Sequence, residues 1–145
     1  VTAANGASYL SGEVGDHVLA ILRSAGAERV RAAAQLHREL PLVYMFDDAG
    51  TGATAPATYV EGYVDLAFEE ADGWVVADYK TDRIPTGGDV ADLVERYRPQ
   101  LAAYAAGLRA AGLTVRETVL WFSATGEMVS VDTVDNAPAI RDNQR

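Results

Sequence analysis

The stretch from Gly62 to Lys80, G-Y-V-D-L-A-F-E-E-A-D-G-W-V-V-A-D-Y-K, has the pattern of two β-strands joined by a tight turn. Residues that favour strands lie on both sides of Asp72-Gly73, a dipeptide typical of hairpin turns. In a strand, alternate side chains share a face, so Asp78 and Lys80 point to the same side. The stretch therefore predicts a hairpin that gathers charged groups on one face of a sheet.

The turn decides which residues of the two strands lie opposite each other. With Ala71-Asp72 as the two-residue loop, Asp65 lies directly opposite Asp78. With Asp72-Gly73 as the loop, it lies opposite Lys80 instead. Both registers place Asp65, Asp78 and Lys80 on one face. The other face is then expected to be a core face, formed by Val60, Val64, Leu66, Phe68, Val75 and Ala77.

Two carboxylates directly across a ladder, with Cβ atoms about 4.5–5.5 Å apart, repel each other, so a compensating group is expected. A divalent cation is one answer, because carboxylate and carbonyl oxygens suit Mg²⁺ or Mn²⁺. An ion pair with Lys80 is another, and a solvated strand face is the plainest alternative. Lys80 is the single lysine among 12 Lys and Arg residues, which favours a specific role for its compact ammonium.

Composition and charge limit the class of protein. The 145 residues contain no cysteine, which excludes disulfides and thiolate zinc sites. The sequence has no apolar run of membrane-spanning length and no signal-peptide pattern, so we expect one cytoplasmic domain. The formal net charge of −9 opposes DNA binding, because cations supply most non-specific affinity for phosphates. We therefore expect weak DNA affinity for this chain alone.

Hydrophobic spacing predicts the remaining elements. A helical segment is expected over residues 12–37, divided at Gly26 and ended by Pro41 at Glu39 or Leu40. Three further strands are expected at Leu42–Phe46, Glu117–Phe122 and Met128–Val131. One long helix is expected at Val90–Ala111, begun or kinked by Pro99 and ended by Gly112. The apolar stripe of that helix is Leu93, Tyr97, Leu101, Tyr104 and Leu108. Irregular segments are expected at 1–10, Asp47–Thr58, Thr81–Asp89 and Asp132–Arg145.

The combination of G-x-x-D, D-Y-K and R-x-Q-L-x-x-Y resembles the nuclease domain of RecB and AddA, a branch of the PD-(D/E)XK superfamily. The similarity runs from R-E-L-P-L at Arg38–Leu42 to the helix that ends near Gly112. The residues on the pattern are Gly62, Asp65, Asp78, Tyr79, Lys80, Gln100 and Tyr104. The resemblance implies an α/β fold with a central mixed sheet flanked by helices, restriction-endonuclease-like, with core order α-β-β-β-α-β.

The same resemblance implies a Mg²⁺- or Mn²⁺-dependent deoxyribonuclease. Asp65, Asp78 and the backbone carbonyl of Tyr79 would hold the metal, which would activate water and stabilise charge on the phosphoryl group. Lys80 would position that water or stabilise the developing negative charge. Asp65, Asp78 and Lys80 are thus the expected catalytic residues.

Substrate contacts are expected on the long helix. Residues four apart share a helix face, and in the resembled family one such Gln and Tyr pair borders the active site. The expected substrate-binding residues are Gln100, Tyr104, Arg96 and Arg98. The two arginines are the cations nearest to that pair in sequence, hence candidates for phosphate contacts. Asp82 and Arg83 could line the entrance, although charged loop residues are usually just solvated.

Two further candidates come from the resemblance. The family has a metal-binding histidine on an early helix, and His17 falls in a similar stretch, G-E-V-G-D-H-V-L. It lies closer to R-E-L-P-L than the family places it, so the alternative is an ordinary helix histidine, with the true ligand upstream of Val1 or absent. Glu39 stands where the family has a glutamate before the first strand, with an active-site or a structural role.

The resembled domains are usually fused to a helicase. Because the first residue is Val, we expect a fragment of a longer helicase-nuclease, to which the helicase portion delivers DNA, with a partner subunit possible. The leading hypothesis is the nuclease domain of a helicase for DNA repair or recombination. One alternative is a catalytically inactive nuclease-fold module with a structural or DNA-handling role. Another is a protein-interaction domain that docks its acidic surface on a basic partner.

Overall fold

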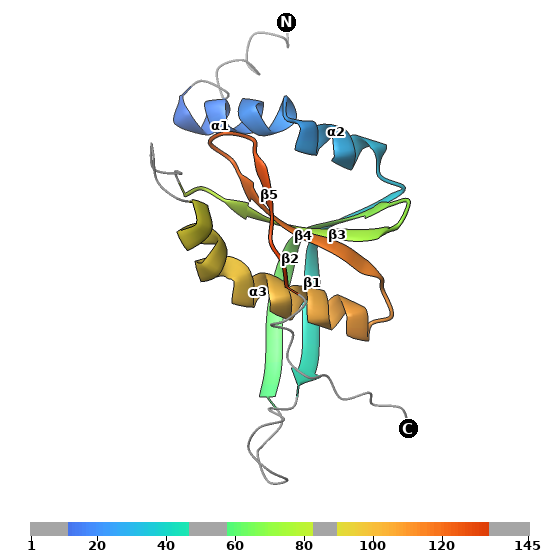
Figure 1. The fold of residues 1–145 in the computed structure, drawn as a ribbon. Helices are drawn as coiled ribbons and strands as arrows, with labels where there is room; N and C mark the ends of the chain where they lie inside the picture. The colour runs from blue at the N-terminus through green and yellow to red at the C-terminus, as the bar shows by residue number, and fades with distance from the viewer. Residues whose placement is uncertain (1–11, 47–57, 83–89, 134–145) are drawn as a thin grey trace, which may run out of the picture.

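The computed structural model describes residues 12–46, 58–82 and 90–133. The elements in chain order are α1 (Glu13–Leu22), α2 (Ala25–Ala32), β1 (Gln35–Phe46), β2 (Thr58–Glu70), β3 (Gly73–Lys80), α3 (Val90–Ala110), β4 (Val115–Phe122) and β5 (Met128–Ser130). They form an α/β fold in which α1 and α2 cover one face of a sheet and α3 covers the other (Figure 1). Several expectations lie outside the described residues: those for 1–10, 47–57, Arg83 and the tail after Thr133.

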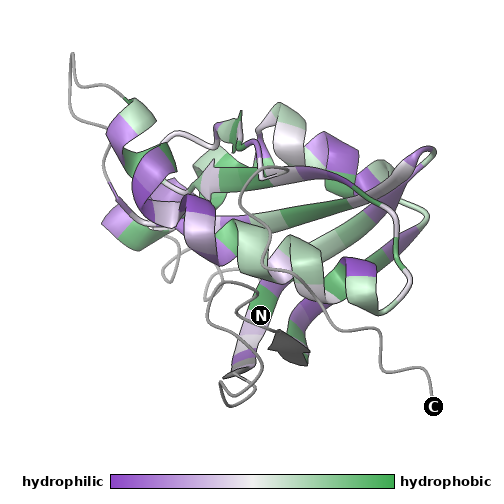
Figure 2. Cartoon of the chain, turned by 60° about the horizontal axis from the view of Figure 1, so that its bottom comes forward, coloured by the Kyte–Doolittle hydropathy of each residue, from purple (hydrophilic) through white to green (hydrophobic). Residues whose placement is uncertain are grey.

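Within the described residues, the sheet has five strands in the order β1-β2-β3-β4-β5, of which only the neighbours β3 and β4 run parallel. Parallel neighbours need a crossover connection, which α3 provides between these two strands. The mixed sheet flanked by helices, with core order α-β-β-β-α-β, is therefore confirmed. Figure 2 shows the central strands largely in the hydrophobic colour, as expected for a sheet covered on both faces.

The hairpin β2-β3 has the register that places Asp65 opposite Asp78. Glu70 pairs with Gly73 and Leu66 with Ala77, so Ala71-Asp72 is the loop, the first of the two alternatives. Gly73 has φ 133, and a Cβ there would lie 2.6 Å from the Thr114 carbonyl oxygen. Only glycine fits this position, which holds the turn against the start of β4.

The pairing of β1 with β2 is interrupted at one point, where Glu39 and Asp65 leave the ladder, and the alternation of side chains between the two faces of the sheet changes there. Glu39 has φ 48, a left-handed conformation that is uncommon for residues other than glycine. Before this point in β2, Val64 belongs to the core under α3; after it, Leu66 and Phe68 belong to the core under α1 and α2. The prediction of one continuous core face from Val60 to Phe68 is therefore wrong, because the alternation changes phase at Asp65.

The predicted first helical segment is wrong in two respects. Helix α2 ends at Ala32, and residues from Gln35 onward pair with β2 rather than continuing a helix to Glu39. Pairing along a strand outweighs a short helical pattern here. The break also lies at Ser24, whose side chain accepts a hydrogen bond from the Ala27 amide and caps α2. Gly26 lies inside α2, packed against Met128.

Helix α3 agrees with its prediction to within one residue at its end. Pro99 lies inside the helix, and Gly112, with φ 88, follows its last turn. Four members of the predicted stripe are buried: Leu93, Leu101, Tyr104 and Leu108. Tyr97, the fifth, is partly buried at the edge of the same core. Among the helices of the described segments, none is long and apolar enough to cross a membrane.

Candidate active site

The two predicted acids meet where β2 and β3 separate. The regular ladder ends at Leu66 and Ala77, so Asp65 and Asp78 are the next opposed positions. Beyond the ladder, the side chain of Asp65 replaces a backbone carbonyl as the acceptor: its Oδ2 accepts a hydrogen bond of 2.8 Å from the Tyr79 amide. The bend at Asp65 therefore positions its side chain beside the end of β3.

Asp78 is a buried carboxylate, with only 3% of the residue exposed. Burial raises the pKa of Asp78, the Lys80 ammonium opposes this rise, and the nearby Asp65 carboxylate adds to it. Asp78 Oδ2 forms an ion pair with Lys80 Nζ. Beyond this ion pair, no described group donates a hydrogen bond to this oxygen. The site thus contains a buried carboxylate oxygen whose described partner is the Lys80 ammonium.

Lys80 is the last residue of β3, and its side chain, which is 12% exposed, contacts α3. Besides its ion pair with Asp78, its Nζ donates a hydrogen bond of 3.2 Å to Gln100 Oε1. The same nitrogen lies 3.8 Å from the centroid of the Tyr97 ring. Among the described residues, the ammonium therefore contacts one charged, one polar and one aromatic side chain.

Gln100 and Tyr104 connect Lys80 to the core under α3. Gln100 Nε2 donates a hydrogen bond of 2.9 Å to the Tyr104 hydroxyl, so the amide bridges the tyrosine and the lysine. Tyr104 is 9% exposed, and its ring covers Gly62, where a Cβ would lie 3.4 Å from Cε1. The glycine of G-x-x-D thus leaves room for the tyrosine of the helix motif.

The structure separates Arg96 from Arg98. Arg98 pairs with Glu95 at 2.5 Å and donates a hydrogen bond to the Asp132 carbonyl, so it is engaged by the segment after β5. Arg96 is exposed and lies one helical turn before Gln100, on the same side of α3. Of the two arginines, Arg98 is therefore engaged within the fold, whereas Arg96 is exposed.

His17 and Glu39 lie at the margins of this site. His17 Nδ1 is 3.0 Å from the Ser123 hydroxyl, and the Ser123 amide donates to the Lys80 carbonyl at 2.9 Å. His17 thus reaches the end of β3 through Ser123. Within residues 12–46, 58–82 and 90–133, no three His, Cys, Asp or Glu side chains come together as a metal-binding group. Glu39 is exposed and leaves the β1-β2 ladder at the same point as Asp65.

Sequence reasoning missed the role of one aromatic residue. The stripe spacing assigns Tyr97 to the core, whereas its ring lies over Lys80 and its hydroxyl donates to Asp82 Oδ2 at 3.0 Å. Its spacing of three residues from Gln100 is the only sequence signal, since residues so spaced share a helix face. Tyr79 points to the opposite side, where it stacks on Trp121 with ring centroids 5.2 Å apart.

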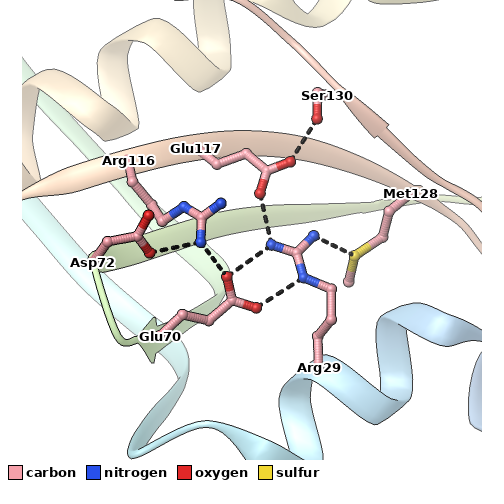
Figure 3. A network of polar contacts seen from close by, with 7 residues as sticks. All are labelled: Arg29, Glu70, Asp72, Arg116, Glu117, Met128 and Ser130. Atoms are coloured by element: carbon pink, nitrogen blue, oxygen red, sulfur yellow. Dashed lines mark hydrogen bonds and ion pairs between the residues drawn. The ribbon is translucent and has the colours of Figure 1, made fainter.

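A second group of charged residues, which we call the Arg29 cluster, lies at the turn end of β3 (Figure 3). Its members come from α2, the β2-β3 hairpin, β4 and β5: Arg29, Glu70, Asp72, Arg116, Glu117 and Ser130. Arg29 contacts Glu70 at 2.8 Å and Glu117 at 2.6 Å, and Arg116 contacts Glu70 at 2.7 Å. The cluster ties α2 to the sheet, and no spacing in the sequence predicts it.

A hairpin that brings two aspartates and a lysine together, on a mixed sheet between helices, is typical of one class of nucleases. The chain belongs to the PD-(D/E)XK nuclease superfamily, whose family model matches residues 3–143.

Individual relatives carry a more specific name. An ATP-dependent helicase/nuclease subunit from Alkaliphilus oremlandii (strain OhILAs) is 37% identical over 65% of this chain and 8% of the relative. The protein of the same name from Bacillus cereus (strain AH187) is 33% identical over 81% of this chain and 10% of the relative. The solved structure of SSO0001 aligns with a TM-score of 0.48 and 16% identity, over 86% of this chain and 52% of that one. The chain therefore spans a tenth or less of these two helicase/nuclease relatives.

Proposed function

We propose that this chain is the DNA-hydrolysing domain of a helicase-nuclease and that it requires a divalent metal ion. The observation that carries the proposal is the convergence of Asp65, buried Asp78 and Lys80 at the divergence of β2 and β3. Buried titratable groups with raised pKa values are typical of functional sites. Membership in a nuclease superfamily supplies the class of reaction.

The residues present suit Mg²⁺ or Mn²⁺. Asp65, Asp78 and the Tyr79 carbonyl offer the hard oxygen ligands that these ions prefer. The burial of Asp78 beside the Asp65 carboxylate supports this fit, because buried negative charge is costly unless cations compensate it. When bound, a divalent cation supplies Lewis-acid polarisation of the phosphodiester.

Lys80 is the residue that we assign to charge stabilisation. Its ammonium, poised beside Asp78, can move toward a phosphate oxygen on which negative charge develops. Gln100, bonded to both Lys80 and Tyr104, limits the orientations of the lysine side chain. Arg96, exposed one turn earlier, is the candidate for holding a neighbouring phosphate.

We further propose that the domain acts within a longer chain. The two relatives named above are helicase/nuclease proteins of which this chain matches a tenth or less. A helicase portion would deliver the DNA, which accounts for a net charge of −9 in a DNA-cleaving domain. Its setting would be DNA repair or recombination, within a helicase-nuclease complex that includes a partner protein.

Cleavage of linear DNA by this chain, with Mg²⁺, with Mn²⁺ and with a chelator, tests the proposal. Either metal should support hydrolysis, and the chelator should stop it. Alanine at Asp65, Asp78 or Lys80 should abolish cleavage while the thermal unfolding transition stays cooperative. Unchanged cleavage in any of these three variants would contradict the assignment.

One observation favours a second candidate, an inactive nuclease-fold module with a structural or DNA-handling role. His17 contacts Ser123, and the described chain assembles two carboxylates rather than a larger ligand group. A chain that binds Mn²⁺ through Asp65 and Asp78 but leaves DNA intact would identify this alternative. Metal-dependent cleavage by the same preparation would exclude it.

A further inference from the structure

The ring of Tyr97 is held against Lys80 from two sides. It projects from the same face of α3 as Gln100, and both residues contact the nitrogen of Lys80. The centroid of the Tyr97 ring lies 3.8 Å from Lys80 Nζ, and Gln100 Oε1 lies 3.2 Å from it. Its hydroxyl donates a hydrogen bond of 3.0 Å to Asp82 Oδ2. Because Asp82 follows Lys80 by two residues, the ring is fixed both by its helix and by the segment that leaves β3.

We propose that Tyr97 is a positioning residue for Lys80, with its ring holding the ammonium beside Asp78 and its hydroxyl anchored by Asp82. The inference rests on the proposed function, because the position of Lys80 matters for hydrolysis only if the domain cleaves DNA. It adds a residue outside the pattern of G-x-x-D, D-Y-K and R-x-Q-L-x-x-Y.

The chemistry of an aromatic ring suits this task. The negative face of the ring attracts a cation, and the attraction grows when water is excluded, as it largely is around Lys80. A second carboxylate at this place would compete with a phosphate oxygen for the ammonium, whereas an aromatic ring attracts the ammonium more weakly. The ring also restricts a flexible side chain that would otherwise sample many rotamers.

Three substitutions distinguish the effect of the Tyr97 ring from that of its hydroxyl group. Tyr97→Leu keeps an apolar side chain at the edge of the core under α3 but removes the aromatic face. Tyr97→Phe keeps the face and removes the hydrogen bond to Asp82. Asp82→Asn keeps an acceptor oxygen for the Tyr97 hydroxyl and removes the charge. Tyr59→Leu, at a tyrosine of β2 that is 69% exposed, is the matched control for loss of a tyrosine.

The single lysine of the chain permits a direct readout of the contact. Lysine labelled with ¹³C at Cε gives one side-chain signal from the whole protein. A ring at the observed distance shifts the attached protons upfield through its ring current. We expect this shift in the unsubstituted chain, in Tyr97→Phe and in Tyr59→Leu, and its loss in Tyr97→Leu. A signal that stays the same in Tyr97→Leu would overturn the proposal.

Steady-state cleavage kinetics then test the role. In Tyr97→Leu, kcat should fall roughly tenfold with KM nearly unchanged, since a misplaced ammonium weakens charge stabilisation more than DNA binding. Tyr97→Phe and Asp82→Asn should stay within about threefold of the unsubstituted rate, because a ring remains. Equal losses in Tyr97→Phe and Tyr97→Leu would overturn the role of the ring, as would full activity in Tyr97→Leu. A failure of the unsubstituted chain to cleave DNA would instead defeat the proposed hydrolysis itself.

Discussion

The two ends of β3 treat charged side chains in opposite ways. At the turn end, each arginine of the Arg29 cluster contacts two acids, and hydrogen bonding to Arg29 lowers the pKa of Glu70 below its ordinary value. At the other end, burial raises the pKa of Asp78 despite its contact with Lys80. Both ends gather charged side chains, yet the net effect of the surroundings favours the ionised acid only at the turn end.

The difference separates a structural cluster from a candidate active site. Acids with lowered pKa values favour the folded state at neutral pH, because folding strengthens their ionised form. A buried acid with a raised pKa disfavours the folded state at the same pH, so it is retained at a cost to stability. Such a cost is typical of groups arranged for a ligand or a reaction. The comparison predicts that substitutions at the two ends affect different properties.

The largest expected contrast is between two isosteric changes of acid to amide. Asp78→Asn should slow DNA cleavage by at least about a thousandfold, because several kcal/mol of transition-state stabilisation depend on this ligand position. Glu70→Gln, in the Arg29 cluster, should cleave at a rate within about twofold of the unsubstituted chain. Metal-dependent cleavage assays measure both. Comparable losses in the two variants would end the distinction between the two regions.

A second contrast exchanges the two kinds of cation. Lys80→Arg should lower the cleavage rate by about a hundredfold, because a wide guanidinium cannot take the place of an ammonium among Asp78, Gln100 and Tyr97. Arg116→Lys, at the turn end, is the reciprocal change and should leave the rate nearly unchanged. The same assay compares them. A fully active Lys80→Arg would show that any cation serves at this position.

The order of effects should reverse for stability. Arg29→Met should lower the free energy of unfolding by about 2 kcal/mol, since it leaves Glu70 and Glu117 with fewer partners in a half-buried setting. Asp78→Asn should change that free energy by less than about 1 kcal/mol, because it relieves burial of a charge while it removes a partner of Lys80. Urea unfolding at neutral pH gives both values. A larger loss in Asp78→Asn would make Asp78 a structural residue.

The smallest effect is in the pH dependence of stability. The pKa of Glu70 is below its ordinary 4.5 in the folded state, so its contribution is present above pH 4.5 and is lost as the pH falls through the lowered value. Asp78 has the opposite sign: its pKa lies above the ordinary 3.8, so protonation relieves its burial as the pH falls toward 3.8.

Free energies of unfolding measured with urea across the acid pH range separate these two contributions. In Glu70→Gln, the free energy of unfolding that is lost as the pH falls should be smaller by about 1 kcal/mol or less, because partly exposed ion pairs are screened by solvent. Asp78→Asn should steepen that loss slightly, because it removes a group whose protonation compensates for it. Identical acid profiles for the two variants would contradict the opposite signs of the pKa shifts.

Local pattern was sufficient to predict much of the fold and the site. Asp72-Gly73 between two strand patterns predicted the hairpin and reduced its register to two alternatives, one of which is correct. Residue spacing also predicted α3, and the family resemblance placed Gln100 and Tyr104 beside the expected active site; in the structure Gln100 contacts both Lys80 and Tyr104. The hairpin and α3 depend on contacts within one element or between adjacent strands, where sequence distance determines spatial distance. The contact between Gln100 and Lys80 joins two elements, and only the family resemblance indicated it.

The features that were missed depend on long-range contacts. The segment from Gln35 forms a strand because β2 is available to pair with it, and the phase change at Asp65 follows from packing on two different cores. The meeting of Arg29 with Glu117 joins the second helix to the fourth strand. The ring of Tyr97 could be assigned to a helix face, but not to a lysine on another element.

Calorimetric titration with Mn²⁺ tests the central claim most directly: that Asp65 and Asp78 converge as ligands of one divalent ion. The account predicts saturable binding by the unsubstituted chain and by Glu70→Gln, and a loss of that binding in Asp65→Asn and in Asp78→Asn. Equal Mn²⁺ binding by all four proteins would contradict it, because the acids at the end of β3 would then not be the ligands.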